Sequence, residues 1–368
     1  MTVSDFQHVI EEWAPVWTAW DRDNVGLQLG RRDQHVSKIM IALEITDRVV
    51  KEAARKKIDL VVTHHPPLFH PVTSLTDAHP TGRNFLTLAR NNVAVYSAHT
   101  NLDFTLNGVS FALARAIGLQ NVRFLSPLEA KLSKIVVFVP QSHVEQVALA
   151  MSKSGAGIIG DYESCSFRVD GVGTFKGTEA SHPYLGKKQS LERVKEVRLE
   201  MVAPTAAIAS VVGALKAVHP YEEVAYDIYP MSSPSANYGM GAIGNLDRDL
   251  TLKAFLQRCK KVLDAQSLRY VGDERQKVRT IAVCGGSGSD LLDKAVRARA
   301  DAFVTADIRY HTFHAADERI ALIDAGHWET EHCILEPLRA RLLQAARQRN
   351  QKVSITLAQT PTNPVKSV

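Results

Sequence analysis

The chain has 368 residues, which is too long for one ordinary core and about right for two domains. Its hydrophobic fraction of 45% is typical of a globular protein, and no apolar run approaches the ~20 residues needed to span a bilayer. The net charge of +5 forms no basic stripe with interleaved aromatics, so charge does not indicate nucleic-acid binding. Four cysteines without Cys-x-x-Cys spacing indicate reduced thiols, and we expect a cytoplasmic protein.

The first residues predict a helix rather than a signal peptide. Ser4 is the expected cap, and Gln7 would complete a capping box.

Strand and helix patterns alternate over residues 38–125. This alternation favours a parallel sheet with right-handed crossovers. The expected strands are Lys38–Leu43, Ile58–Thr63 and Val93–Ser97, and the expected helices are Asp47–Lys57, Gly82–Asn91 and Gly108–Ile117.

The pattern changes near Ser126 and Pro127, and a strand-helix-strand-strand-helix-strand order follows. This is the order of a ferredoxin-like α+β fold, which can fold by itself. The expected elements are Lys134–Pro140, His143–Ser154, Gly171–Phe175, Val194–Met201, Ala206–Val218 and Val224–Tyr229.

The β-α alternation returns after a linker at 230–234. We therefore predict one α/β domain, residues 1–126 and 236–368, interrupted by an insertion domain at 127–235. The later expected elements are Leu252–Leu263, Thr280–Cys284, Asp290–Arg299, Ala302–Thr305, Ile320–Asp324, Thr330–Gln348 and Val353–Ala358.

A pair of adjacent histidines ends one of the predicted strands. His64 and His65 follow the apolar run 60–63, and Pro66 and Pro67 prevent the strand from continuing. Open α/β sheets bind ligands at the carboxyl ends of their strands, and imidazole is the commonest metal ligand. A polar loop that happens to contain two histidines is the alternative.

Other predicted strands also end in polar side chains that suit a metal. Strand 93–97 leads to His99 and Asp103, and strand 320–324 leads to His327 and Glu331, which lie four residues apart on one helix face. The carboxyl ends of parallel strands share one sheet edge, so these residues should converge. Taken alone, His327 and Glu331 could be a solvated pair, and Asp103 could cap a turn.

This mixed set of imidazoles and carboxylates predicts a site for two divalent ions. Nitrogen and oxygen ligands suit Zn, Mn, Fe, Co or Ni, and two neighbouring ions would activate water and polarise a substrate oxygen. The expected ligands are His64, His65, Asp103, His327 and Glu331.

Four further side chains at strand ends are weaker candidates. They would orient the ligands, or would simply form buried hydrogen bonds. They are Glu44, His99, Asp307 and His311. The glycine-rich run 285–290 would hold an anion at a helix start or form a tight structural turn.

Five motifs in this order resemble the Nif-three-like family, whose members are described as dinuclear metal centre hexameric proteins or GTP cyclohydrolase 1 type 2 homologues. The resemblance covers nearly the whole chain. The motifs are Asp23–Gln28, Thr63–Pro66, Ser97–Asp103, Gly285–Gly288 and Gly326–Glu331. Glu44 stands where the family usually has Asp, and the first motif has a longer spacing than usual.

The resemblance implies the same five metal ligands and a toroidal homohexamer. It also implies that 134–230 is a PII/CutA-like insertion of the kind that some members carry. Within it, the run His219–Glu223 would be functional or a packing corner.

These observations lead to a metal-dependent hydrolase as the first hypothesis, and the resemblance implies a cyclic amide or a purine nucleotide such as GTP as its substrate. Glu331 or His99 would move protons. The alternative is a hexameric regulatory or scaffold protein that binds a metabolite, a nucleotide or a transcription partner without turnover. Metal storage is a third hypothesis, and none of the three involves a membrane.

Overall fold

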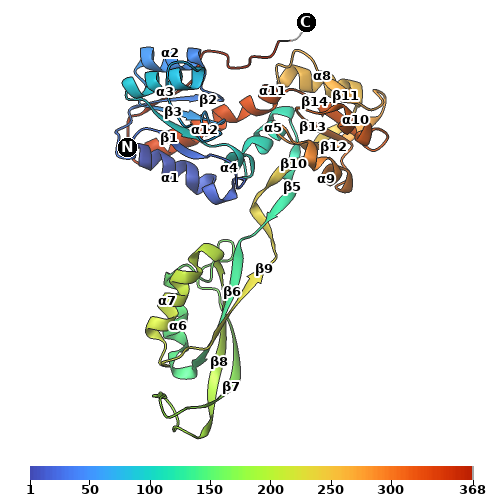
Figure 1. Cartoon of the computed structure of the whole chain (residues 1–368). Coiled ribbons are helices and arrows are strands. Elements are labelled where there is room, and N and C mark those ends of the chain that lie inside the picture. Colours follow the sequence, from blue (N-terminus) through green and yellow to red (C-terminus); the bar gives the residue numbers. More distant parts are fainter. Residues whose placement is uncertain (367–368) are drawn as a thin grey trace. The chain divides into compact units, whose positions relative to one another are not determined.

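The computed structural model describes residues 1–366 and divides the chain into two compact units (Figure 1). The core unit consists of Met1–Leu128 together with Ala236–Val368, and the insertion unit is Glu129–Ser235. The fold is mixed α/β, as predicted, with several sheets. No helix within residues 1–366 is both long and apolar enough to cross a membrane.

The first half of the core unit is a three-layer sandwich around a five-stranded sheet of order β1-β4-β3-β2-β15. Strand β1 is antiparallel to β4, whereas the other neighbours are parallel. The strands are β1 Gly26–Leu29, β2 Lys38–Ala42, β3 Leu60–Thr63, β4 Ala94–Ser97 and β15 Ser354–Leu357. The helices are α1 Val3–Trp13, α2 Asp47–Lys56, α3 Pro80–Arg90 and α12 Leu335–Gln348.

Alternation along β2 explains the layers. Ile39 and Ile41 face the cluster formed with α1 and α12, and Met40 and Ala42 face the cluster formed with α2 and α3. Both faces are covered, so the four buried positions from Ile39 to Ala42 are all apolar, as is usual for a parallel sheet.

The second half of the core unit is built on a six-stranded sheet of order β11-β14-β13-β12-β10-β5. Its strands β12, β13 and β14 are parallel, whereas β10 runs antiparallel to β12 and β11 runs antiparallel to β14. The strands are β5 Gln120–Glu129, β10 Pro234–Thr251, β11 Arg269–Val271, β12 Lys277–Val283, β13 Ala302–Thr305 and β14 Ala321–Asp324. Helices α5 Val109–Ile117 and α8 Leu252–Val262 cover one face, and α9 Leu292–Arg297 and α10 Tyr310–Ala316 the other.

The core unit has two sheets, so the single sheet predicted from the β-α alternation is wrong. Four strands were not expected, and the two longest, β5 and β10, lie where a boundary and a linker were predicted. Strand β10 contains three glycines and β5 contains Pro127, and both residue types are typical of turns. Because β5 is an edge strand, its proline is tolerated.

The predicted helix over 330–348 is interrupted. It begins earlier, as α11 His327–Glu331, passes through a 3-10 turn at His332–Ile334, and resumes as α12. Pro337 explains the break, because it has no amide hydrogen to donate to the carbonyl of Cys333 and its ring would collide with that carbonyl.

The insertion unit is an antiparallel sheet of order β7-β8-β6-β9, with α6 and α7 packed on one face. Its elements are β6 Leu132–Pro140, α6 Val144–Lys153, β7 Phe167–Lys176, β8 Leu191–Pro204, α7 Ile208–Val218 and β9 Tyr226–Met231. Ile135, Val137 and Leu199 point to the helices, whereas Phe138, Glu196 and Arg198 have the opposite parity.

The cap of α1 lies two residues before the predicted one. The Thr2 hydroxyl accepts from the amide of Asp5, whose carboxylate accepts from the amide of Thr2, and this completes a capping box. Ser4 is already inside the helix. The prediction of a cap at Ser4 is therefore wrong, because the capping box between Thr2 and Asp5 starts the helix at Val3.

Replacing Thr2 by alanine should lower the free energy of unfolding by about 1 kcal/mol, since it removes the acceptor for the Asp5 amide. Urea unfolding followed by circular dichroism measures the change. The matched variant Ser4→Ala should stay within about 0.5 kcal/mol of the wild type. An equal or larger effect at Ser4 would contradict this capping assignment.

Candidate metal centre

The side chains expected to bind metal meet where the ends of the two core sheets face each other. His64 and His65 follow β3, Asp103 ends the short helix α4 Thr100–Asp103 after β4, and His327 and Glu331 lie on α11 after β14. The prediction that they share one edge of a single sheet is wrong, because the first three belong to the five-stranded sheet and the last two follow the six-stranded sheet.

The two adjacent histidines serve one cluster although they are neighbours in sequence. The amides of His64 and His65 donate to the carbonyls of Ala42 and Leu43, which keeps the chain beside β2 after β3 has ended. The two imidazole centroids lie 4.9 Å apart with the rings tilted by 46°. His64 is completely buried, and His65 is half-buried.

Glu331 lies at the centre of the cluster. Its Oε2 is 2.9 Å from His65 Nε2, and its Oε1 is 3.2 Å from His327 Nε2 and 3.7 Å from His64 Nε2. The Nε2 atoms of His65 and His327 are 3.4 Å apart. One buried carboxylate thus contacts three imidazoles, and His65, His327 and Glu331 form a group that could hold a metal ion.

Three buried polar atoms of the cluster have no hydrogen-bond partner. They are His64 Nε2, Asp103 Oδ1 and Glu331 Oε2, although His64 Nε2 lies 3.5 Å from Asp103 Oδ1 and His65 Nε2 lies 2.9 Å from Glu331 Oε2. Buried polar atoms are normally paired, and leaving one unpaired costs about 1–3 kcal/mol. A divalent ion accepts electron pairs from such nitrogen and oxygen atoms, so these residues fit one.

Oxygen atoms outside the cluster fix the orientation of each ring. The Nδ1 atom of each of four histidines donates to an oxygen, which leaves Nε2 for the inside of the cluster. The pairs are His64 with the Ala98 carbonyl at 2.8 Å, His65 with Glu44 at 3.1 Å, His99 with Asp23 at 2.9 Å and His327 with Asp307 at 2.6 Å. Such partners are typical of metal-binding histidines.

The four weaker candidates differ in whether they contact the cluster. Glu44 and Asp307 contact imidazoles of the cluster, so they orient candidate ligands. His99 joins His64 and His65 in a second group that could hold a metal ion. His311 is exposed on α10 with its ring against Tyr310, outside both groups.

Asp23 was not recognised as a site residue from the sequence. Its side chain is buried; one oxygen accepts from His99 Nδ1 and the other from the amide and hydroxyl of Thr100. Burial opposes its ionisation, but His99 and Thr100 outweigh that cost and lower the pKa of Asp23 to about 2. Asp23 directly follows the turn at Asp21 and Arg22, so no strand end marked it, although it begins the first of the five motifs.

The pKa values of the imidazoles and carboxylates in the cluster are shifted in opposite directions. Burial disfavours imidazolium, but contact with Glu331 overrides it, so the pKa of His65 is raised to about 10 and that of His327 to about 9. Burial also opposes ionisation of Glu331, but His64, His327 and His65 hold its pKa well below the usual range. Burial raises the pKa of Asp103. His65 and His327 are therefore protonated at neutral pH in the absence of a metal, and Asp103, with a pKa raised to about 7, is partly protonated.

The glycine-rich run is a structural turn that supports Glu331. The Gly286 amide donates to Thr330 Oγ1, and the Gly288 amide donates to Thr305 Oγ1, so both amides have partners within the protein. Gly286 has a φ of +59°, and a Cβ there would lie 2.1 Å from Glu331 Oε1. These contacts fit the tight structural turn, and anion binding by the remaining amides of the run stays a prediction.

A cavity of about 520 Å³ adjoins the cluster. Glu44, Asp307 and His327 line it, together with Arg269 and the C-terminal segment around Asn363. The C-terminal segment is tied to α11 by two hydrogen bonds, from Trp328 Nε1 to Thr362 Oγ1 and from Asn363 Nδ2 to Glu329 Oε1. A small molecule in this cavity would lie beside the candidate ligands.

Comparison with known proteins gives consistent results. The family model described as Duf34/NIF3 (NGG1p interacting factor 3) matches residues 1–364. A Bacillus subtilis protein named GTP cyclohydrolase 1 type 2 homolog is 37% identical over 358 residues, covering 97% of this chain and 96% of its own. A Mycobacterium leprae protein of the same name is 39% identical, covering 89% and 86%. The crystal structure of a Bacillus cereus protein related to NIF3 matches with a TM-score of 0.82 at 35% identity, covering 100% and 99%.

Substituting His64 or Glu331 by alanine should reduce bound metal to less than about half of the wild-type content, because each removes a ligand atom from the cluster. Elemental analysis after purification, with circular dichroism to monitor folding, measures the effect. His311→Ala is the matched control and should leave the metal content unchanged, since this exposed histidine lies outside the cluster. Unchanged metal in both cluster variants would refute the ligand assignment.

Metal binding at pH 7 should release two protons or more, because neutral imidazole is the ligand and the pKa values of about 10 for His65 and about 9 for His327 keep both protonated, while Asp103, with a pKa of about 7, adds a fraction of a proton. Raising the pH toward these values removes the competing protons, so the metal affinity should rise. Calorimetry in buffers of different ionisation enthalpy measures the release. Heats independent of the buffer would contradict the predicted protonation.

Proposed function

The chain belongs to the Duf34/NIF3 family over nearly its whole length, and from this premise we propose that it is a dinuclear metal-dependent hydrolase. The observation that carries the proposal is the convergence of three imidazoles on the buried Glu331 carboxylate, beside the buried atoms His64 Nε2 and Asp103 Oδ1, which have no hydrogen-bond partner. The name of its relatives suggests a cyclic amide or the purine of GTP as substrate. We further propose that it works as a toroidal homohexamer in the cytoplasm.

The five expected ligands would be divided between two ions. His64 and Asp103 would hold one, and His65 and His327 the other. Glu331 contacts imidazoles of both groups, because its Oε1 lies near His64 and His327 and its Oε2 lies near His65. Two bound divalent ions supply Lewis acidity toward a substrate oxygen and an activated water. Zn, Mn, Fe, Co and Ni all suit this donor set.

His99 is the residue best placed to move a proton. Asp23 accepts from its Nδ1 and fixes the ring, so Nε2 remains to take a proton or give one up beside His64 and His65. Glu331 is less suited, because the surrounding imidazoles hold its pKa well below the usual range and keep it ionised. We therefore assign Glu331 to metal binding and His99 to proton transfer.

A regulatory or scaffold function is the second candidate. It is favoured by the insertion unit, whose 107 residues from Glu129 to Ser235 contribute no side chain to the metal cluster and contain a cavity of their own. In this case the cluster would be structural, and a metabolite, nucleotide or transcription partner would bind without turnover.

Protein loaded with a single kind of metal in each preparation should open the purine ring of GTP or hydrolyse another cyclic amide. The reaction is measured as a loss of substrate absorbance. His99→Gln should lower kcat by about 10²–10⁴-fold while the metal content is retained, because it removes the proton-transferring imidazole but none of the five ligands.

His311→Gln is the matched control and should keep wild-type turnover and metal. No turnover with any metal, combined with saturable nucleotide binding, would favour the regulatory function. Loss of metal in His99→Gln would instead make His99 a ligand.

A further inference from the structure

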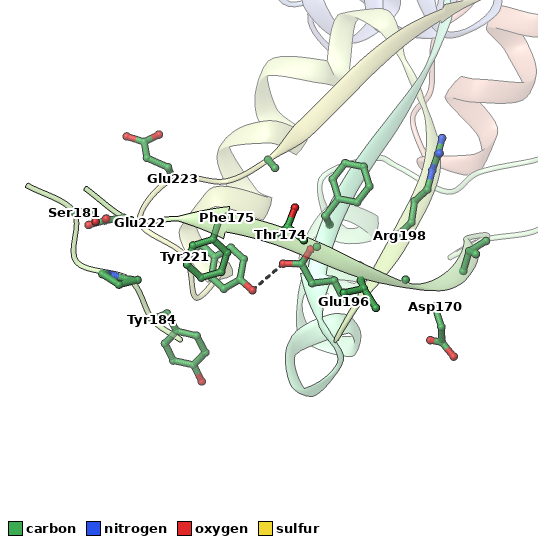
Figure 2. Close-up of a pocket in the computed structure, with 18 residues that line it drawn as sticks. Asp170, Thr174, Phe175, Ser181, Tyr184, Glu196, Arg198, Tyr221, Glu222 and Glu223 are labelled. Carbon is green, nitrogen blue, oxygen red and sulfur yellow. Dashed lines mark hydrogen bonds between the residues drawn. The ribbon is translucent and has the colours of Figure 1, made fainter. Parts of the chain in front are cut away.

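The insertion unit contains a cavity of about 550 Å³ that the metal chemistry does not use (Figure 2). It lies over strands β7 and β8 on the face of the sheet opposite α6 and α7, and the segment 181–184 and the turn 221–223 add to its wall. The cavity is formed entirely by residues 138–225, so it belongs to this unit alone.

Two glycines of β7 create the hollow. Gly171 and Gly173 pair with Glu196 and Val194 of β8 and share their face of the sheet. A Cβ at Gly171 would have no heavy atom closer than 3.9 Å, so its missing side chain leaves open space. A Cβ at Gly173 would lie 2.0 Å from Glu196 Oε2, so this glycine makes room for the carboxylate.

Aromatic rings form one end of the cavity. The centroid of Tyr221 lies 6.4 Å from that of Phe175 and 6.3 Å from that of Tyr184, with the rings tilted by 58° and 49°. Tilted rings, unlike stacked ones, leave much of each π face uncovered. Tyr184 is about half exposed, and all three rings line the cavity.

A carboxylate is held beside these rings. The Tyr221 hydroxyl donates to Glu196 Oε1 at 2.8 Å, which is the hydrogen bond drawn in Figure 2. His219 fixes the start of the turn, because its Nε2 donates to the Phe138 carbonyl and its Nδ1 accepts from the amide of Tyr221. The run His219–Glu223 is therefore a packing corner that also directs Tyr221 toward Glu196.

The cavity lining is strongly acidic. Three lining carboxylates, Glu196, Glu222 and Glu223, and one guanidinium belong to it, with no lysine or histidine. Asp170 also lines the cavity, but it pairs with Val197, so its side chain lies on the helix-covered face. The guanidinium of Arg198 is already paired with Glu200, at 2.9 Å. The lining therefore carries a net negative charge and would repel an anion.

We propose that this cavity binds an organic cation, with an alkylammonium group against Phe175, Tyr184 and Tyr221 and beside the Glu196 carboxylate. Aromatic faces attract a cation through their quadrupole, and sets of such rings recognise quaternary ammonium groups. A bare metal ion fits less well, since it needs several oxygens converging on one point. Within residues 1–366 the groups that could hold a metal contain no residue of this cavity.

Calorimetric titration of the full chain with choline tests the proposal. Choline should bind saturably, whereas dimethylbutanol, its uncharged analogue with carbon in place of nitrogen, should bind at least about tenfold more weakly because it lacks the cation–π attraction. Equal binding of the two compounds, or no binding of choline, would overturn the proposal.

Two variants locate the site. Gly171→Leu should abolish choline binding, because its side chain would fill the hollow where a Cβ meets no atom within 3.9 Å. Tyr184→Ala should weaken binding by about tenfold through the loss of one ring. Tyr162→Ala is the matched control, since Tyr162 is an exposed tyrosine of the same unit outside the cavity, and it should bind as the wild type does.

The variants also exclude the main alternatives. Choline affinity unchanged in Gly171→Leu would place the cation elsewhere and refute the assignment. Sedimentation of the same samples gives an independent readout, because a changed oligomeric state in Gly171→Leu, with choline binding intact, would identify this face as an interface between copies. Circular dichroism of each variant confirms that the insertion unit is folded.

Discussion

The burial of the Glu331 carboxylate is the constraint on which the centre of the core unit depends. An ionised carboxylate away from water is unstable unless it is paired, and here the partners are imidazoles from two different sheets. His64 and His65 come from the five-stranded sheet, and His327 comes from the same helix as Glu331. Pairing this one carboxylate with imidazoles from both sheets therefore fixes how the two halves of the core unit pack against each other.

The surrounding backbone serves the same requirement. Thr330, next to Glu331, accepts from the Gly286 amide and donates to the Gly326 carbonyl, so one hydroxyl joins the loops after β12 and β14. Gly286 lies so close to Glu331 that a side chain would displace the carboxylate. The glycines and the threonine of these motifs therefore position the carboxylate, although they have no chemistry of their own.

Much of the centre could be predicted, because strand ends in an α/β protein indicate where side chains converge. This reasoning brought together His64, His65, Asp103, His327 and Glu331, which the structure places in one cluster; that they bind metal stays a prediction. It could not identify Asp23, because a residue after an irregular turn has no strand to mark its position. It also merged two sheets into one, since local patterns report that strands exist but not which strands pair. The glycine-rich β10 depends on tertiary packing that overrides local propensity, whereas the break before Pro337 is a local effect of the proline that the sequence does contain.

The place where the insertion enters the core has an evolutionary consequence. The chain leaves the core unit along β5 and returns along β10, and these two strands are neighbours at the edge of the six-stranded sheet. A short hairpin turn could therefore replace the whole insertion without changing the order of any other strand in that sheet. A gene could acquire or lose such a module in one step, and the module could then change its ligand without altering the metal centre.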